Sequence, residues 1–145
     1  MKELSKETAK ETPTSAPLVD TRILGELAGP QPNAGVLEWA AATHRIALSV
    51  VTLEEISAGL ARRPSPRLRA WLDAFVADHC DVLDVTAPIA RLAGTLRGQL
   101  AARRRMRPQA DMLVVATAAH HGLVLVTRHV RELAGLGVSL QNPFS

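Results

Sequence analysis

Short apolar runs alternate with helical periodicity along most of the chain. Runs of β-forming residues predict strands at residues 18–20, 46–51, 82–85, 123–127 and 138–140. Between these runs, apolar residues recur at the three- and four-residue spacing of amphipathic helices. Strands separated by crossover helices form parallel sheets that are covered on both faces. The pattern therefore predicts a three-layer α/β fold, with a small, mainly parallel five-stranded sheet flanked by helices.

Proline and glycine residues set the expected helix boundaries. Gly29 and Pro30 end the helix that follows the first strand, and Pro64 ends the helix that follows the second. Pro108 opens a helix that runs on until Gly122 stops it, because proline suits the first turn of a helix and glycine suits its end. These signals predict a helix immediately before the fourth strand.

Composition divides the chain into a leader and one domain. The chain has 145 residues, which is enough for a single hydrophobic core. Residues 1–17 hold all the lysines and almost no core-forming side chains, so we expect a flexible leader or a cloning remnant there and one domain at residues 18–145. No signal peptide is visible, and no apolar run reaches the roughly 18 residues that a membrane span needs. We therefore expect a cytoplasmic protein with no membrane segment.

The basic side chains of the domain are all arginines. Beyond Lys10 the chain carries a small excess of arginine over acidic residues, consistent with its net charge of +3. Arginine binds phosphate well because its planar fork donates two hydrogen bonds at once, so the charge weakly favours a nucleic-acid partner. The absence of lysine after Lys10 excludes a GKS or GKT phosphate-binding loop and Schiff-base chemistry in the domain. No GxGxxG motif is present for a dinucleotide.

Three carboxylates lie where an apolar run passes into a helix: Asp20, Glu55 and Asp111. Burying an ionised carboxylate without a partner is costly, so something must compensate each of them. Sites in open parallel sheets form at the carboxyl ends of the strands, and all three positions can line one crevice there. Converging carboxylates suit a divalent cation, and the chemistry that fits such a site is hydrolysis of a phosphodiester.

Each acid also has a purely structural interpretation. Asp20 can cap the helix that follows it. Thr52 and Glu55 have the spacing of a capping box, which would place Glu55 in the first turn of its helix. Asp111 lies in a predicted first turn, where a carboxylate interacts favourably with the helix dipole. From the residues alone, both interpretations stay open.

Four segments carry a family resemblance, in the order LVDTRILGEL, LSVVTLEEISAGL, ADMLVVATAAHHGLVLVTRHVREL and NPF. Together they resemble the PIN-domain family, and more narrowly the VapC and FitB-like toxins of bacterial toxin–antitoxin modules. The resemblance runs from Leu18 to Phe144. It implies a PIN-like fold, usually as a homodimer, and a Mg²⁺- or Mn²⁺-dependent endoribonuclease. Such an enzyme cleaves RNA and is neutralised by a cognate VapB-like antitoxin.

The resemblance also assigns roles to individual residues. Asp20, Glu55 and Asp111 match the family's catalytic acids, which hold the metal ion. Thr127 matches a position that supports the site by hydrogen bonding from the end of its strand. Its alternative is a strand residue chosen for β-branching.

Two positions depart from the family pattern, and both are close to the predicted site. Arg22 stands where asparagine is common, and it would either pair with Asp20 or Asp111 in competition with the metal or point into solvent. His129 stands where asparagine or aspartate is common, and it is either a metal or phosphate contact or an exposed loop residue. Glu132 is a candidate for the missing fourth acid. An impaired metal site would leave a module that mainly binds antitoxin or RNA.

A run of arginines precedes the helix of Asp111 and has two interpretations. It is either a solvated loop or a patch that contacts RNA phosphates beside the acids, with salt-sensitive binding as its signature. The candidate contacts are Arg103, Arg104, Arg105 and Arg107. A third functional class, a phosphoacceptor domain of receiver type, needs a lysine near its site, and residues 11–145 contain none.

Overall fold

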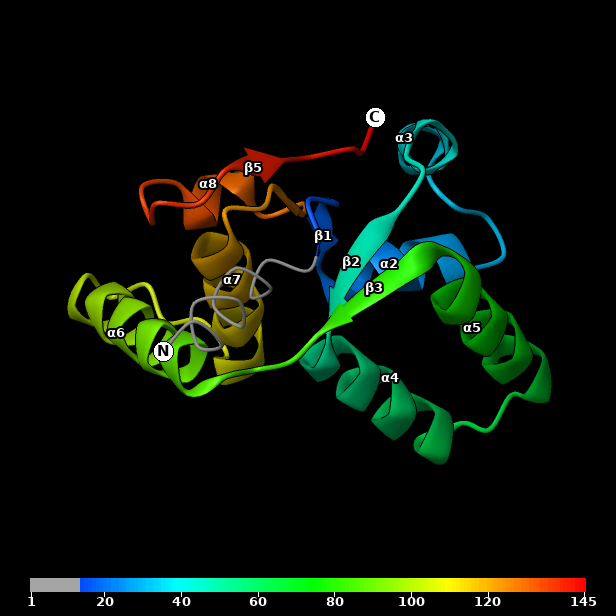
Figure 1. Ribbon diagram of the computed structural model, residues 1–145, viewed down its shortest axis with the longest axis horizontal. Coiled ribbons are helices and arrows are strands. Elements are labelled where there is room, and N and C mark those ends of the chain that lie inside the picture. Colours follow the sequence, from blue (N-terminus) through cyan, green and yellow to red (C-terminus); the bar gives the residue numbers. More distant parts are fainter. Residues whose placement is uncertain (1–13) are drawn as a thin grey trace, which may run out of the picture.

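A five-stranded parallel sheet forms the centre of the computed structural model, which describes residues 14–145 (Figure 1). Its strands lie in the order β3-β2-β1-β4-β5, and all the pairs are parallel. The strands are β1 (Leu18–Val19), β2 (Ile46–Ser49), β3 (Cys80–Leu83), β4 (Leu125–Val126) and β5 (Leu140–Gln141). The predicted five-stranded sheet is confirmed. Residues 1–13 of the predicted leader lie outside the described residues.

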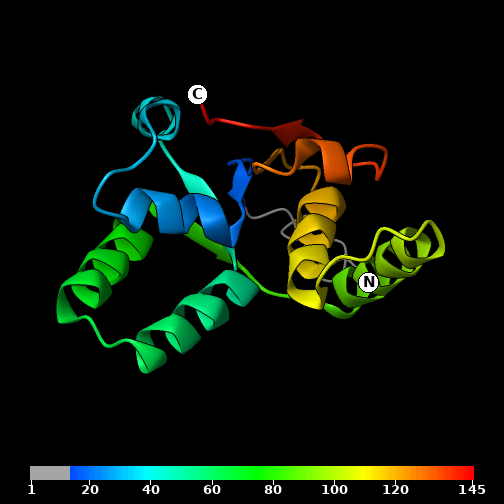
Figure 2. The same cartoon turned by 180° about the vertical axis from the view of Figure 1, so that it is seen from behind.

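Helices cover both faces of the sheet, which confirms the three-layer α/β fold (Figures 1 and 2). One face carries α2 (Thr21–Ala28), α3 (Ala34–Ala42), α4 (Val50–Arg62) and α5 (Pro66–His79). The other carries α6 (Ala87–Ala102), α7 (Gln109–His121) and the short α8 (Val130–Leu133). None of the helices in this described part of the chain has the length and apolar character needed to cross a membrane.

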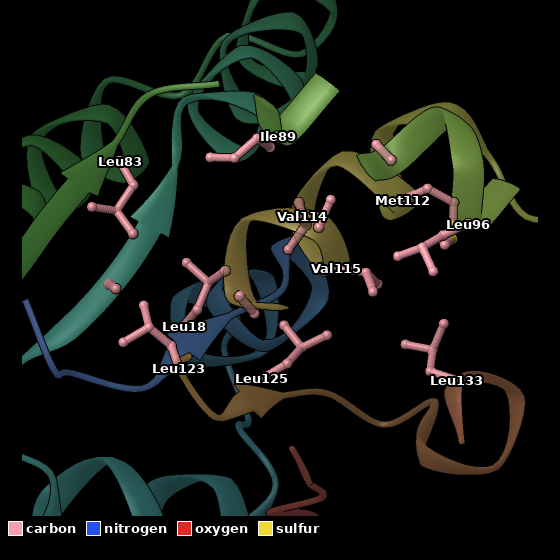
Figure 3. Close-up of a cluster of buried hydrophobic side chains, with 14 of the residues drawn as sticks. Leu18, Leu83, Ile89, Leu96, Met112, Val114, Val115, Leu123, Leu125 and Leu133 are labelled. Carbon is pink, nitrogen blue, oxygen red and sulfur yellow. The ribbon is translucent and has the colours of Figure 1, made fainter. Parts of the chain in front are cut away.

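Alternating strand residues divide the core into two clusters, because successive side chains of a strand point to opposite faces. Leu18 and Leu125 are buried against α6 and α7, where Figure 3 shows them beside Val114 and Val115. Val19 and Val126 point the other way, into the cluster under α2 to α5. Burial on both faces explains why the strands read as continuous apolar runs in the sequence.

The start of α4 differs from the sequence prediction in a way that matters for the site. The strand was expected to run to residue 51, with Thr52 and Glu55 as a capping box, but β2 ends at Ser49. Ser49 is the N-cap, and its hydroxyl accepts a hydrogen bond from the Val51 amide at 3.0 Å. Thr52 is therefore fully buried within the first turn, and Glu55 lies in the second. The capping-box interpretation of Glu55 is wrong.

The other differences concern the ends of elements. The third strand begins at Cys80 rather than at residue 82, and α8 was not predicted because four residues are too few for a periodic pattern. Gly122 ends α7 as expected, in a left-handed conformation with φ 66°. Contacts with the sheet begin one residue before the predicted domain boundary, since the Pro17 carbonyl accepts a hydrogen bond from the Ala47 amide at 2.8 Å.

An ion pair lies at the end of the sheet where the strands begin. The Arg45 guanidinium donates to the Asp81 carboxylate at 2.6 Å, and this hydrogen bond is the main cause of the lowered pKa of Asp81. Beside it, burial raises the pKa of the Cys80 thiol to about 11, so the thiol stays protonated. Arg45 lies at the opposite end of the strands from the site described below.

The last residues of the chain dock on the start of α3. The Asn33 side chain, which caps α3, accepts hydrogen bonds from the amides of Gly35 and Ser145 at 3.0 and 3.1 Å. Phe144 lies beneath the Arg128 guanidinium, with 4.6 Å between the charge and the ring centre. A Cβ atom at position 35 would come within 2.4 Å of the Pro143 carbonyl oxygen. This close approach requires glycine.

We predict that Gly35→Ala destabilises the protein by about 1–3 kcal/mol, because backbone atoms of the docked segment cannot yield as a side chain would. Urea denaturation followed by circular dichroism measures the change. Gly59→Ala is the matched control, since a Cβ there meets nothing within 4 Å. The control should gain about 0.5–1 kcal/mol from helix propensity. Equal stability of the Gly35→Ala variant and the wild type would contradict the docking.

Candidate active site

The sheet order places Asp20 and Thr127 side by side. The neighbours β2 and β4 lie on either side of β1, so the chain leaves β1 at a topological switch point. Val19 pairs with Val126, the last residues of β1 and β4. The residues that follow them, Asp20 and Thr127, are therefore neighbours. The Thr127 hydroxyl donates to Oδ2 of Asp20 at 2.6 Å. The hydrogen bond expected of Thr127 is present.

The Asp20 carboxylate has a different partner for each oxygen. Its Oδ1 accepts from the Ile23 amide at 3.0 Å, which makes it the N-cap of α2. Its Oδ2 accepts from Thr127, whose oxygen in turn accepts from the His129 amide at 3.1 Å. Asp20 is thus a helix cap, as the structural interpretation held, and a wall of the cavity as well. The capping interpretation of Asp20 is confirmed, and its role as a metal ligand stays a prediction.

Glu55 reaches the same region from α4 through a contact with α2. The Thr21 hydroxyl donates to Oε1 of Glu55 at 2.6 Å and lies 3.0 Å from the hydroxyl of Thr52. Neither threonine carries a charge, so the carboxylate of Glu55 is oriented without being neutralised. The threonine that follows Asp20 in the sequence therefore has a definite structural role.

Asp111 lies in the first turn of α7, as predicted, but its partner was not foreseen. Arg107 donates from Nη2 to Oδ2 of Asp111 at 2.9 Å. The side chains are 18% and 29% exposed, so water screens this pair only in part. The Nε of Arg107 is buried and has no hydrogen-bond partner among the described residues. The arginine that meets an acid is Arg107, not Arg22.

Arg22 is exposed, as one of its two alternatives predicted, and the predicted pairing with Asp20 or Asp111 is absent among the described residues. Its guanidinium lines the cavity and donates to Nε2 of His129. Because arginine only donates, this ring nitrogen must accept, and Nδ1 of His129 faces Glu132 Oε2 at 3.8 Å. The pKa of Glu132 is lowered first by a hydrogen bond from its own backbone amide and further by the charge of Arg107. Glu132 lies outside the cavity, so it does not stand beside the other acids as a fourth member.

These side chains enclose a cavity of about 110 Å³ at the carboxyl ends of the strands. Its polar wall contains Asp20, Glu55 and Asp111 together with Arg22 and Arg107. Its apolar wall comes from α7, β4 and α8, namely Val114, Val115, Leu125 and Leu133. The cavity thus brings together the three acids that the sequence singled out. One of the two guanidinium groups, that of Arg107, pairs directly with an acid of the cavity, Asp111.

The carboxylate oxygens of this cavity are suitable ligands for a hard cation. Their present arrangement, however, does not form a complete metal-binding site. Carboxylate oxygens are the ligands that Mg²⁺ and Mn²⁺ take in proteins. Yet among residues 14–145 no group of three His, Cys, Asp or Glu side chains is placed to hold one ion. The contact of Arg107 with Asp111 gives a physical reason, since a guanidinium already occupies one carboxylate.

The remaining arginines of the predicted patch lie on the surface. Arg103, Arg104 and Arg105 are exposed in the loop between α6 and α7, and none of them lines the cavity. Of the four candidate RNA contacts, only Arg107 reaches the acids. The pairing of Arg107 with Asp111 could have been predicted from the sequence, because the two residues have the i, i+4 spacing of a helical ion pair.

We predict that Thr127→Val lowers the free energy of unfolding by about 1–3 kcal/mol, because it removes a charge-assisted hydrogen bond from a buried position. Thr127→Ser keeps the hydroxyl and should lose less. Thermal and urea denaturation of both variants measure the difference. Unchanged stability of Thr127→Val would show that the hydroxyl does not contribute.

Comparisons with known proteins agree with this geometry. The family model described as PIN domain matches residues 18–131. The chain is similar to a VapC ribonuclease, Y4jK, of Sinorhizobium fredii, with 27% identity over 135 residues, 88% of this chain and 96% of that protein. It is also similar to a tRNA(fMet)-specific endonuclease VapC of Shigella flexneri, with 33% identity over 94 residues, 64% of this chain and 70% of that protein.

A solved structure gives the same fold. DNA-bound VapBC from Salmonella typhimurium superposes with a TM-score of 0.77 at 24% identity, covering 88% of this chain and 98% of that one. The family model spans most of the chain, including β1 to β4 and all three acids of the cavity. The chain therefore belongs to the PIN domain family.

Proposed function

We propose that this protein is a metal-dependent endoribonuclease toxin that cleaves RNA phosphodiester bonds and is neutralised by a cognate antitoxin. One observation carries the proposal: Asp20, Glu55 and Asp111 come from three separate elements and line one cavity at the switch point of the sheet. Acids with only structural roles would have no reason to share a cavity. Glu55 in particular has no capping role, because α4 begins at Val50.

The hydrogen bonds of Asp20 and Glu55 support a role for these acids as cation ligands. Asp20 is fixed from two sides by the Ile23 amide and Thr127, and Glu55 is fixed by Thr21. Fixed carboxylates present their remaining lone pairs to the cavity, where they would hold Mg²⁺ or Mn²⁺ together with Asp111. A divalent cation in such a site neutralises phosphate charge and lowers the pKa of a bound water.

The proposed partners are RNA, a VapB-like antitoxin and a second copy of the chain, acting in the cytoplasm. Support for RNA comes from the names of the Sinorhizobium and Shigella relatives, a ribonuclease and a tRNA-specific endonuclease. Support for the antitoxin comes from the VapBC assembly that shares the fold. The exposed arginines at 103–105 supply positive charge near the cavity, which suits the RNA backbone.

A second candidate function is favoured by one specific observation. Arg107 neutralises Asp111, and the acids of the cavity do not form a finished metal site in the described residues. A protein fixed in this state would bind RNA or antitoxin without cutting. The two candidates differ in whether added metal produces cleavage.

We predict that the purified protein cleaves single-stranded RNA in the presence of Mn²⁺ and that Asp20→Asn and Asp111→Asn each abolish the cleavage. Each substitution removes a carboxylate charge from the cavity and preserves the side-chain size. Asp73→Asn is the matched control, because Asp73 is an exposed acid on α5 that does not line the cavity. Gel electrophoresis of labelled RNA measures the rate, and circular dichroism checks the fold. Cleavage that survives both cavity substitutions would place the activity elsewhere.

We predict further that EDTA stops the cleavage and that Mg²⁺ or Mn²⁺ restores it, since the carboxylates alone supply no Lewis acid. Titration of metal into the EDTA-treated protein measures the requirement. RNA binding by fluorescence anisotropy, without cleavage at any metal concentration, would instead support the binding module.

A further inference from the structure

Arg107 lies between two cavities. On one side it lines the cavity of the three acids. On the other it lines a groove of about 380 Å³ together with Arg105, Met106, Arg131 and Glu132. Arg107 belongs to the loop that precedes α7, so its long side chain is not held by a helix on either flank. Arg107 thus borders both cavities from a single position in the chain.

The hydrogen bonding of Arg107 is incomplete where it now stands. One nitrogen, Nη2, donates to Asp111, while the buried Nε has no partner among the described residues. A buried donor without a partner costs free energy that a better-matched acceptor would recover. A phosphate offers several oxygens to the planar fork of an arginine, and such pairs are often bidentate.

Resting on the proposed function, we infer that Arg107 is an exchangeable counterion. In the metal-free protein it neutralises Asp111. When a divalent cation takes Asp111, the guanidinium moves to the neighbouring groove and holds a phosphate of the RNA strand. Arg107 is therefore both a competitor of the metal and a binding residue for the substrate.

The groove suits a phosphate on grounds of charge and shape. Arg105 and Arg131 line it with Arg107, and Glu132 is the one acid of its lining. Met106 is 82% exposed beside them and supplies an apolar contact surface. Arg107 already lines this groove in its present position.

The first test measures metal affinity without RNA. We predict that Arg107→Gln binds Mn²⁺ about fivefold more tightly than the wild type, because the ion no longer displaces a cation. Electron paramagnetic resonance of free Mn²⁺ gives the dissociation constant. Arg107→Lys keeps the charge and should remain near the wild-type affinity. Arg45→Gln is the matched control, since it removes an arginine–carboxylate pair at the opposite end of the strands, and it should bind Mn²⁺ as the wild type does.

The outcomes separate this inference from the proposed function. Asp111→Asn serves as the control for the position of the ion, because loss of Mn²⁺ binding in this variant places the ion in the cavity. Unchanged or weaker Mn²⁺ binding by Arg107→Gln would then overturn the inference. A purely structural role of Arg107 would also weaken binding. If neither the wild type nor Arg107→Gln binds Mn²⁺, the proposed metal-dependent function fails, and the exchange fails with it.

The second test measures the substrate side. At saturating Mn²⁺, Arg107→Gln should raise the KM for a short single-stranded RNA about tenfold with little change in kcat, because a phosphate contact is lost and the ion is in place. Arg45→Gln should leave both constants unchanged. Tighter Mn²⁺ binding with an unchanged KM would overturn the phosphate contact and indicate that the released guanidinium turns to Glu132.

Discussion

The hydrogen bond between Thr127 and Asp20 fixes the site at the point where the sheet reverses its order. Because β4 joins β1 on the side away from β2, residues 107 positions apart in sequence become neighbours at the same register. The strands themselves are short, at two residues each for β1 and β4. Buried side chains on both faces hold these strands in register, and a one-residue slip would turn Leu18 and Val19 to the wrong faces. The packing of the core thus sets the distance between the threonine hydroxyl and the carboxylate.

The three acids of the cavity are stabilised in two different ways. Asp20 and Glu55 accept hydrogen bonds from hydroxyl and amide groups, which orient a carboxylate but leave its charge in place. Asp111 accepts from a guanidinium, which cancels its charge. Cation attraction is therefore concentrated on the α2 and α4 side of the cavity. The α7 side is the place where a cation must compete.

The period of the apolar residues was sufficient to predict the fold class and the parallel five-stranded sheet, whereas the choice of the three acids as one site also needed the family resemblance. Prediction from the sequence failed where two local signals compete. Thr52 and Glu55 match the spacing of a capping box, yet the N-cap of α4 is Ser49. The buried hydroxyl of Thr52 lies against that of Thr21 instead, so tertiary contacts override the local pattern. The partner of Asp111 was missed for a different reason. Arg22 stood out by its departure from the family pattern, whereas Arg107 stood in a run of arginines that read as a solvated loop.

Charge balance explains why Arg107 and Arg22 are not equivalent. Arg22 is the second residue of α2, but its guanidinium lies against the His129 ring, so it neutralises no acid of the cavity. Arg107 meets Asp111 directly, and it belongs to the loop between α6 and α7. In the proposed exchange, a cation that entered the cavity would be attracted by Asp20 and Glu55 before it displaced Arg107. The cost of exchange then falls on a single ion pair, partly open to water, whose guanidinium has a groove lined by two more arginines beside it.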